Sequence, residues 1–323
     1  MEQLGLELTD IMMPWITVLV SLIVAVWLKD YATSIAKGLK FKMNPAFNEG
    51  DEVLYPNPGF PIYESMINYV GGVPVPMQLH ESKEFSIDIE EIESKITSKT
   101  KLMILNSPNN PCGSIITKND LEKLAELSIK HDIYVMSDEI YIRFLYEGKH
   151  ESITQFQGMV DRTIILDGFS KTYAMTGWRI GYGIMPEDLV SQMGKLMANS
   201  VSCTSSATQI AAIEALDGSQ DEPNKMVQEF KRRREIIVNG LNNIKGISCQ
   251  MPKGAFYVFP NIKETGMSSR NFADNLLQEA GVACLAGEDF GKYGDGFVRF
   301  SFANSAENIQ KALDRIDSFV QKI

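Results

Sequence analysis

The sequence predicts an α/β fold, with a large domain built on a mainly parallel sheet that has helices on both faces, and a smaller C-terminal α+β domain. Two observations support this. Short strand-like runs alternate with turns and helix signals in the first two thirds of the chain, and the pattern changes after about Asp221. Strand, helix and strand in succession need a crossover connection, which makes neighbouring strands parallel. We expect an atypical N-terminal segment over 1–46, a large domain over 47–222 and a small domain over 223–323.

Six short runs are predicted as strands of the large domain. They are Glu52–Tyr55, Val73–Met77, Leu102–Leu105, Ile133–Met136, Thr163–Leu166 and Arg179–Ile184. Several are apolar throughout, which is typical of strands buried on both faces. Between the third and the fourth, TKNDLEKLAELSIKHD predicts an amphipathic helix, because Thr117 suits the N-cap and apolar residues follow with helical spacing.

The C-terminal third has a different pattern. A helix is expected near Met226–Ile244, with apolar residues on one side and a basic run, best explained as a solvated face, on the other. GAFYVFP (Gly254–Pro260) and FVRFSFA (Phe297–Ala303) are strand-like, and a final helix carries Ile309 and Leu313 on its apolar side. This mixture predicts a smaller α+β domain.

Composition narrows the classes of function. The 323 residues include 31 Lys and Arg against 41 Asp and Glu, a net charge of -10, which disfavours a nucleic-acid surface. Four cysteines without a C-x-x-C pair and three histidines indicate neither a zinc site nor a disulfide framework. Free thiols suit a reducing compartment, so the cytoplasm is the expected location.

One apolar stretch stands apart from this composition. Residues 11–28, IMMPWITVLVSLIVAVWL, carry no charge and are barely long enough to cross a bilayer. Acidic residues precede the stretch and lysines follow it, so a spanning helix would leave the rest of the chain in the cytosol. The alternative is an apolar segment without a membrane role, and the sequence leaves both possibilities open.

Polar residues follow three consecutive strands. They are Asn110 after the third, Asp138 and Tyr141 after the fourth, and Ser170, Lys171 and Arg179 after the fifth. Singly, each has a structural explanation as a turn, cap, packing or surface residue. Together, a lysine that can attack an aldehyde, an acid that can protonate a ring nitrogen and an arginine that can hold a phosphate match the requirements of pyridoxal phosphate (PLP).

Five motifs carry a family resemblance. They are NNPCG (Asn109–Gly113), SDEIY (Ser137–Tyr141), SKTYAMTGWRIGYG (Ser170–Gly183), PKGAFYVFP (Pro252–Pro260) and VRFSFAN (Val298–Asn304). From about Glu49 to Val320 the chain resembles the class I and II aminotransferases of PLP fold type I, and is aspartate or aromatic aminotransferase-like. The resemblance implies amino transfer between an amino acid and a 2-oxo acid, with PLP as cofactor and a homodimer as the usual assembly.

The resemblance also implies roles for the catalytic residues. Lys171 would bind the cofactor aldehyde covalently and, once released, move a proton between the substrate α-carbon and the cofactor. Asp138 would remain ionised beside the pyridine nitrogen and keep it protonated, while Tyr141 and Asn110 would bind the phenolic oxygen.

The remaining implied contacts concern the phosphate, the ring face and the substrate. Arg179, with Ser170 nearby, would hold the phosphate, and Phe60 in YPNPGFPIY would stack on the ring. Arg299 matches the arginine that binds the substrate carboxylate, helped by Asn110, although an arginine on an exposed strand face is the alternative. Gly254 is expected to allow close packing near the site, or to be a plain turn glycine.

The family pattern is incomplete near the N-terminus. The resemblance implies a strand, a glycine-rich phosphate-binding turn and a helix between Pro45 and Phe47, and about thirty residues of such a unit are lacking. A central strand and its covering helix would then be absent. Alternatives to an aminotransferase are therefore a truncated, non-catalytic or membrane-tethered relative, and another PLP enzyme of the same fold, such as a carbon–sulfur lyase.

Overall fold

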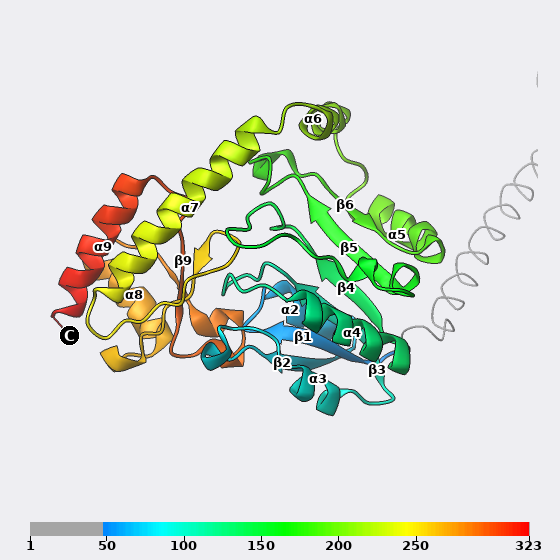
Figure 1. The fold of residues 1–323 in the computed structure, drawn as a ribbon, viewed down its shortest axis with the longest axis horizontal. Coiled ribbons are helices and arrows are strands. Elements are labelled where there is room, and N and C mark those ends of the chain that lie inside the picture. The colour runs from blue at the N-terminus through cyan, green and yellow to red at the C-terminus, as the bar shows by residue number, and fades with distance from the viewer. Residues whose placement is uncertain (1–47, 323) are drawn as a thin grey trace, which may run out of the picture. The chain divides into compact units, whose positions relative to one another are not determined.

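A computed structural model describes residues 48–322, and its main sheet has six strands in the order β2-β1-β3-β4-β5-β6. The strands are β1 (Glu52–Asn57), β2 (Val73–Gln78), β3 (Thr100–Asn106), β4 (Tyr134–Asp138), β5 (Thr163–Gly168) and β6 (Gly181–Ile184). All neighbours pair in parallel except β5 and β6, which are antiparallel. The predicted strands and the mainly parallel sheet are confirmed, with small differences at the strand ends (Figure 1).

Helices cover both faces of this sheet: α3 (Ile89–Lys95) and α4 (Lys118–His131) pack on one face and α2 (Ile62–Tyr69) on the other. Two further helices, α5 (Glu187–Ser200) and α6 (Ser206–Asp217), follow β6. Successive residues of β1 point to opposite faces: Leu54 lies in a core with Leu124 of α4, whereas Val53 lies in a core with Ile67 of α2. The predicted cap is present, because the Thr117 hydroxyl accepts a hydrogen bond from the Asp120 N–H at the start of α4.

The C-terminal part is built from α7 (Asp221–Asn242), α8 (Ser269–Ala280) and α9 (Ala306–Val320) around a three-stranded antiparallel sheet. Its strands are β7 (Tyr257–Val258), β8 (Leu285–Ala286) and β9 (Val298–Ser301), in the order β7-β9-β8. GAFYVFP forms only the short β7, because Ala255 has a positive φ of 57° that interrupts extended backbone. These helices gather to one side of the six-stranded sheet (Figure 1).

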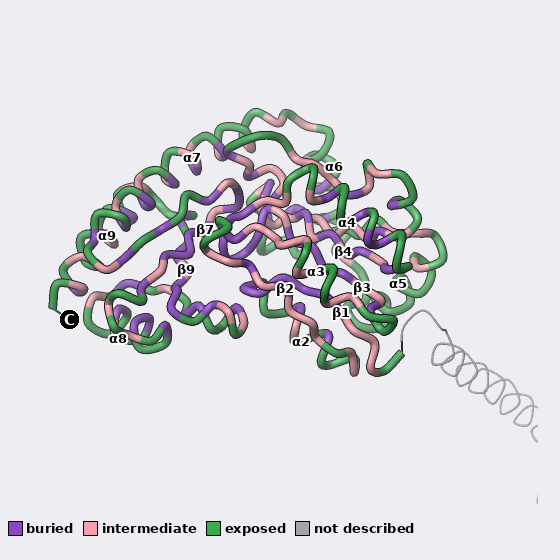
Figure 2. Tube along the Cα trace, turned by 60° about the horizontal axis from the view of Figure 1, so that its bottom comes forward, coloured by how far each residue is buried: buried purple, intermediate pink, exposed green. Residues whose placement is uncertain are grey.

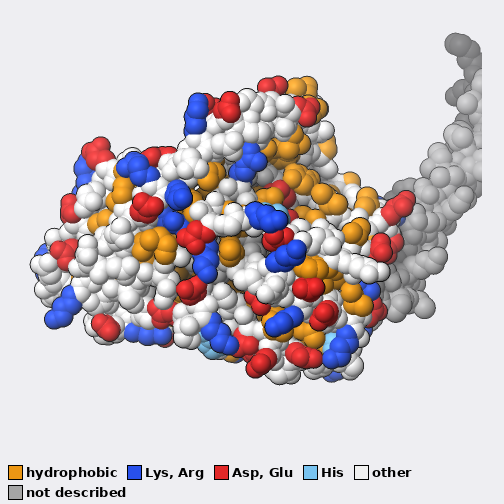
Figure 3. All heavy atoms as spheres, viewed as in Figure 1, with side chains coloured by type: hydrophobic (Ala, Val, Ile, Leu, Met, Phe, Trp, Pro, Cys, Tyr) orange, Lys and Arg blue, Asp and Glu red, His pale blue; other side chains and the backbone are white. Residues whose placement is uncertain are grey.

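The β6 side of the main sheet has little cover among the described residues. All four residues of β6 are exposed, and α5 has no buried residue although Val190, Met193 and Leu196 are apolar. Figure 2 shows α5 and α6 mostly exposed, and Figure 3 shows apolar side chains gathered near them. Among the described residues the six strands pair without a gap, and the uncovered surface lies at the β6 edge, so a missing strand would lie at that edge and not at the centre of the sheet.

The apolar stretch 11–28 lies outside the described residues. Within 48–322, no helix combines the length and hydropathy that a membrane span requires.

Candidate active site

A cavity of about 360 Å³ opens where β3, β4 and β5 end. Its lining includes predicted site residues from distant parts of the chain, namely Phe60, Asn110, Asp138, Tyr141, Lys171 and Arg299. The carboxyl ends of parallel strands meet at one edge of a sheet, which is why the residues after β3, β4 and β5 converge.

Asp138 is the last residue of β4, and its carboxylate is held by two donors. The Tyr63 hydroxyl donates to Oδ2 at 2.5 Å and the Ile140 N–H donates to Oδ1 at 3.3 Å. Burial raises the pKa of Asp138, and the Tyr63 and Ile140 hydrogen bonds oppose that rise. Asp167 and Glu139 add like-charge repulsion that raises the pKa further.

Tyr141 presents a protonated phenol to the cavity. Its hydroxyl lies 2.8 Å from the Tyr257 hydroxyl, and its ring centroid lies 5.9 Å from Lys171 Nζ. Burial, followed by the neighbouring Tyr257, raises the pKa of Tyr141 above its usual value. The phenol therefore stays neutral at physiological pH and can donate a hydrogen bond.

Lys171 follows β5 and is partly buried. Burial lowers the pKa of its amine, and the positive charges of Arg299 and Arg179 lower it further, while Asp138 acts in the opposite direction. A lowered pKa increases the neutral, nucleophilic fraction of the amine.

Arg299 of β9 extends from the small sheet into the same cavity. Its Nη1 donates to Asn110 Oδ1 at 2.9 Å, and its guanidinium carbon lies 4.4 Å from the Tyr257 ring centroid and 4.8 Å from that of Phe290. The exposed-face alternative is excluded, because Arg299 is only partly exposed and its Nε is buried without a hydrogen-bond partner. Its guanidinium lines the cavity, which suits an anionic ligand.

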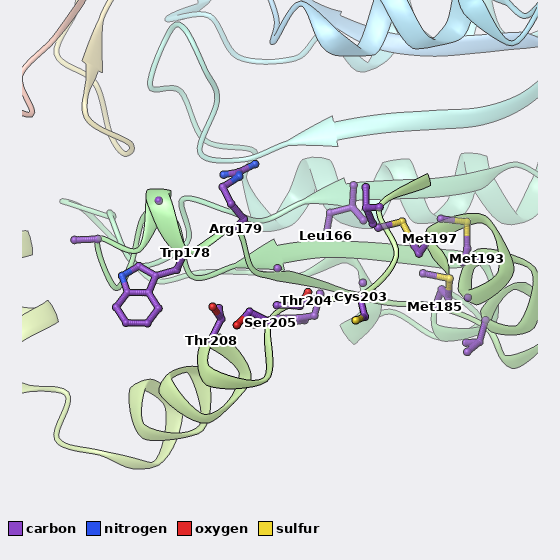
Figure 4. Close-up of a pocket in the computed structure, with 18 residues that line it drawn as sticks. Leu166, Trp178, Arg179, Met185, Met193, Met197, Cys203, Thr204, Ser205 and Thr208 are labelled. Atoms are coloured by element: carbon purple, nitrogen blue, oxygen red, sulfur yellow. The ribbon is translucent and has the colours of Figure 1, made fainter. Parts of the chain in front are cut away.

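Arg179 and Ser170 do not line this cavity. Arg179 lines a larger neighbouring cavity of about 1160 Å³, formed by β6, α5 and the start of α6, and its Nη1 donates to the Thr176 carbonyl at 2.9 Å. In Figure 4, Met185, Met193 and Met197 lie together at one end of this cavity and Trp178 at the other. The two cavities share Leu166, so Arg179 lies next to the site and not within it.

The structure adds residues that the sequence analysis did not select. Tyr63, Asn106 and Tyr257 line the cavity, and the Asn106 amide donates to the Asp138 carbonyl at 3.3 Å. Two of these three residues could have been selected from their positions in the sequence. Tyr63 follows Phe60 by about one helical turn, and Tyr257 lies within the GAFYVFP motif.

Gly254 packs closely against the loop that carries Asn110. A Cβ atom at this position would lie 2.5 Å from Pro108 Cγ and 2.8 Å from the Phe144 carbonyl oxygen. Contact that close leaves no room for a side chain, so the expectation of close packing is confirmed and Gly254 is not a plain turn glycine.

The donor set suits a flat, anionic aldehyde with a ring nitrogen. The cavity offers an amine of lowered pKa at Lys171, a buried carboxylate at Asp138 and a phenol at Tyr141. Phe60 supplies an exposed aromatic ring at the rim, and Arg299 supplies a guanidinium that lines the cavity. These groups match the aldehyde, ring nitrogen, phenolic oxygen and ring face of PLP, with a cationic group left for a substrate carboxylate.

Comparison with known proteins gives consistent matches. The family described as aminotransferase class I and II matches residues 32–316. The chain is 41% identical to an aspartate aminotransferase of Pyrococcus abyssi over 277 residues, which are 85% of this chain and 71% of that protein. It is 40% identical over 277 residues to an aromatic-amino-acid aminotransferase of Thermococcus litoralis, with 85% and 71% covered.

Solved structures give the same result. An aromatic aminotransferase from Pyrococcus horikoshii matches with a TM-score of 0.83 and 40% identity over 86% of this chain and 75% of that one. An aspartate aminotransferase from Thermus thermophilus, solved with maleate, matches with a TM-score of 0.79 and 36% identity over 84% and 71%.

Proposed function

The chain belongs to the aminotransferase class I and II family, and on this premise we propose that its cavity binds PLP and an amino acid for transfer of the amino group to a 2-oxo acid. The observation that carries the assignment is the convergence of Lys171, Asp138, Tyr141 and Arg299 on one cavity. When bound, PLP supplies a protonated ring that withdraws electrons from the substrate α-carbon.

Lys171 provides the nucleophile and the base. Its lowered pKa would make the neutral amine available to bond to an aldehyde carbon, and the same amine, once the amino group of the substrate has displaced it, would accept the proton of the substrate α-carbon. Asp138 would hold the proton of the ring nitrogen through its negative charge, and Tyr141 and the Asn110 amide, which line the same cavity, would donate hydrogen bonds to the phenolic oxygen.

Arg299 orients the substrate. Asn110 accepts a hydrogen bond from the guanidinium, and the rings of Tyr257 and Phe290 lie against it, so the cation is held at the wall of the cavity, where it could bind a carboxylate. A fixed carboxylate sets the direction of the α-carbon bonds relative to the cofactor ring.

The proposal also covers the phosphate contact, the roles of the two domains, the cellular location and the assembly of the chain. Arg179, which lines the larger neighbouring cavity, would bind the phosphate, with Ser170 near it in sequence. A large domain over 47–222 would bind the cofactor, and a small domain over 223–323, which carries Tyr257 and Arg299, would complete the substrate site. All four cysteines are free thiols, which supports a cytoplasmic location. The family supports a homodimer.

The function is tested by incubating the chain with PLP and single amino acids, including aspartate, tyrosine, leucine and the thioether amino acid cystathionine, and by measuring the 2-oxo acid formed in one turnover. Formation of a stoichiometric 2-oxo acid that retains the substrate carbon skeleton supports amino transfer. Release of ammonia or a thiol, without amine retained on the cofactor, would favour the lyase alternative instead.

Replacing Arg299 with glutamine is expected to raise KM for the amino acid by about 100-fold, because a charge-assisted pair with the carboxylate is lost. The introduced amide can still donate a hydrogen bond toward Asn110, so PLP affinity is expected to change little. The measurement compares KM with the PLP dissociation constant in both proteins, and Arg270→Gln, an exposed arginine paired with Glu288, is the control. A loss of PLP binding with unchanged KM would contradict the assignment.

The rate of PLP addition should depend on pH in a way set by Lys171. The neutral amine fraction increases as pH rises through the pKa, and the pKa of Lys171 is lowered from 10.5, so the midpoint should lie below pH 10.5. Arg299→Gln removes one of the charges that lower this pKa and should move the midpoint upward. Stopped-flow absorbance checks this, with Arg232→Gln on α7 as control. A midpoint equal to that of a free lysine would contradict it.

A further inference from the structure

Tyr63 reaches the site from an element that is remote in sequence. It lies in the first turn of α2, its exposed fraction is 5%, and its hydroxyl lies 2.5 Å from Asp138 Oδ2 on β4, across 75 residues of chain. In the same helix region, Phe60 lines the cavity beside it, and the two rings meet edge to face with centroids 5.9 Å apart. One short segment therefore supplies both a ring at the cavity rim and a donor to the buried carboxylate.

The surroundings of Asp138 favour its protonated form, and the Tyr63 hydrogen bond opposes that effect. Burial and the neighbouring carboxylates Asp167 of β5 and Glu139, the residue after β4, all raise the pKa of Asp138. Glu139 is itself bound by His150, whose Nε2 lies 2.9 Å from Oε2, and Asp167 accepts a hydrogen bond from the Tyr182 hydroxyl at 2.8 Å.

The donors to the Asp138 carboxylate are few. The other groups that face Asp138 are the Lys171 amine and the Tyr141 phenol across the cavity. Among residues 48–322, Tyr63 is the one side chain that donates a hydrogen bond to this carboxylate, and the Ile140 N–H is the backbone donor. A hydrogen bond to the charged form stabilises that form.

We propose that Tyr63 is a positioning residue that keeps Asp138 ionised and fixes the direction of its carboxylate in the PLP site. Each carboxylate oxygen accepts more than one hydrogen bond, so Tyr63 on Oδ2 and Ile140 on Oδ1 still leave a lone pair for a ring N–H. The cofactor part of this inference rests on the proposed function, whereas the effect on Asp138 does not.

The test replaces Tyr63 with phenylalanine, which removes the hydroxyl and keeps the ring. The carboxyl pKa of Asp138 is measured without PLP by carbon-13 NMR of labelled aspartate, and the Asp138 signal is identified by its loss in Asp138→Asn. We expect the pKa to rise by about one unit, which is a tenfold change in the protonation equilibrium. The dissociation constant of PLP should rise by about tenfold as well, since the ionised form binds the ring nitrogen.

Tyr146→Phe is the matched control. It removes another buried tyrosine hydroxyl, which donates to the Ala255 carbonyl at 2.6 Å outside the cavity, and should leave the pKa of Asp138 unchanged. Tyr63→His, which keeps an aromatic ring and an N–H donor, should hold the pKa within about half a unit of the unchanged chain. If Tyr63→Phe does not fold, Tyr63→Leu, which also lacks a donor, takes its place, and an unchanged pKa of Asp138 in that variant would contradict the proposal.

The outcomes separate the two claims. An unchanged pKa of Asp138 in folded Tyr63→Phe overturns the role of Tyr63, whether or not the enzyme transfers amino groups. A raised pKa in a chain that never binds PLP supports the action of Tyr63 on Asp138 and contradicts the proposed function instead.

Discussion

Replacement of Lys171 with alanine is expected to lower kcat for amino transfer by about 10⁴-fold, because the same amine serves as nucleophile and as proton acceptor. Its lowered pKa and its place in the cavity with Arg299 and Tyr141 make it the one described lysine suited to both roles. Single-turnover formation of 2-oxo acid from PLP and amino acid measures the loss.

The control for this prediction is Lys225→Ala. Lys225 is an exposed lysine of α7 that pairs with Glu222, so its removal should leave kcat within about twofold and the fold intact. Added methylamine can serve as an external base in Lys171→Ala and should restore part of the proton-transfer rate. A Lys171→Ala protein that keeps most of its activity would show that another group is the base.

Asp138→Asn is expected to lower kcat by about 10³-fold, because the negative charge beside the ring nitrogen is lost while the shape is kept. The Tyr63 hydroxyl and the Ile140 N–H remain near the new amide, so the side chain should stay in place. The absorbance maximum of bound PLP and its response to pH give a readout that is independent of turnover.

Asp167→Asn is the matched control for the loss of a carboxylate. Asp167 lines the same cavity, but the Tyr182 hydroxyl and the Gly168 N–H hold its oxygens. Its replacement should reduce kcat by less than about tenfold, because its hydrogen bonds can be kept by an amide. Equal losses in the two variants would mean that the cavity needs net negative charge and not a carboxylate at Asp138.

The sequence was sufficient to predict the parallel sheet, because buried strands such as Leu102–Leu105 are apolar throughout and the helix between them has a clear cap at Thr117. It did not predict α2 or α8. α2 is a short helix without a side-chain cap, and the Ser268 cap of α8 is a common polar residue that also favours turns.

The convergence of Asn110, Asp138 and Lys171 could also be predicted, since each follows a strand of one parallel sheet. Tyr63 and Tyr257 could not, because their contacts depend on where α2 and β7 pack and not on local pattern. The direction in which such a side chain points depends on tertiary packing, which cannot be predicted from the pattern of a single sequence.

The position of the Arg179 side chain could not be predicted from the motif that contains it. The family resemblance implies a phosphate contact for Arg179, but its backbone has a positive φ of 55° and its guanidinium donates to the Thr176 carbonyl. The cavity it lines is bordered by the exposed β6, where the described sheet ends. The phosphate contact is thus the part of the site in which the structure differs most from what the motifs imply.

Covalent binding of PLP by Lys171, in a site assembled from these residues, can be detected by trapping the bond chemically. The chain is incubated with PLP, reduced with borohydride and digested, and the modified peptide is mapped by mass spectrometry. We predict a single stoichiometric adduct on Lys171 that is absent from Lys171→Ala. A folded sample that gives no adduct, or gives adducts spread over exposed lysines, would contradict the account and favour a non-catalytic relative.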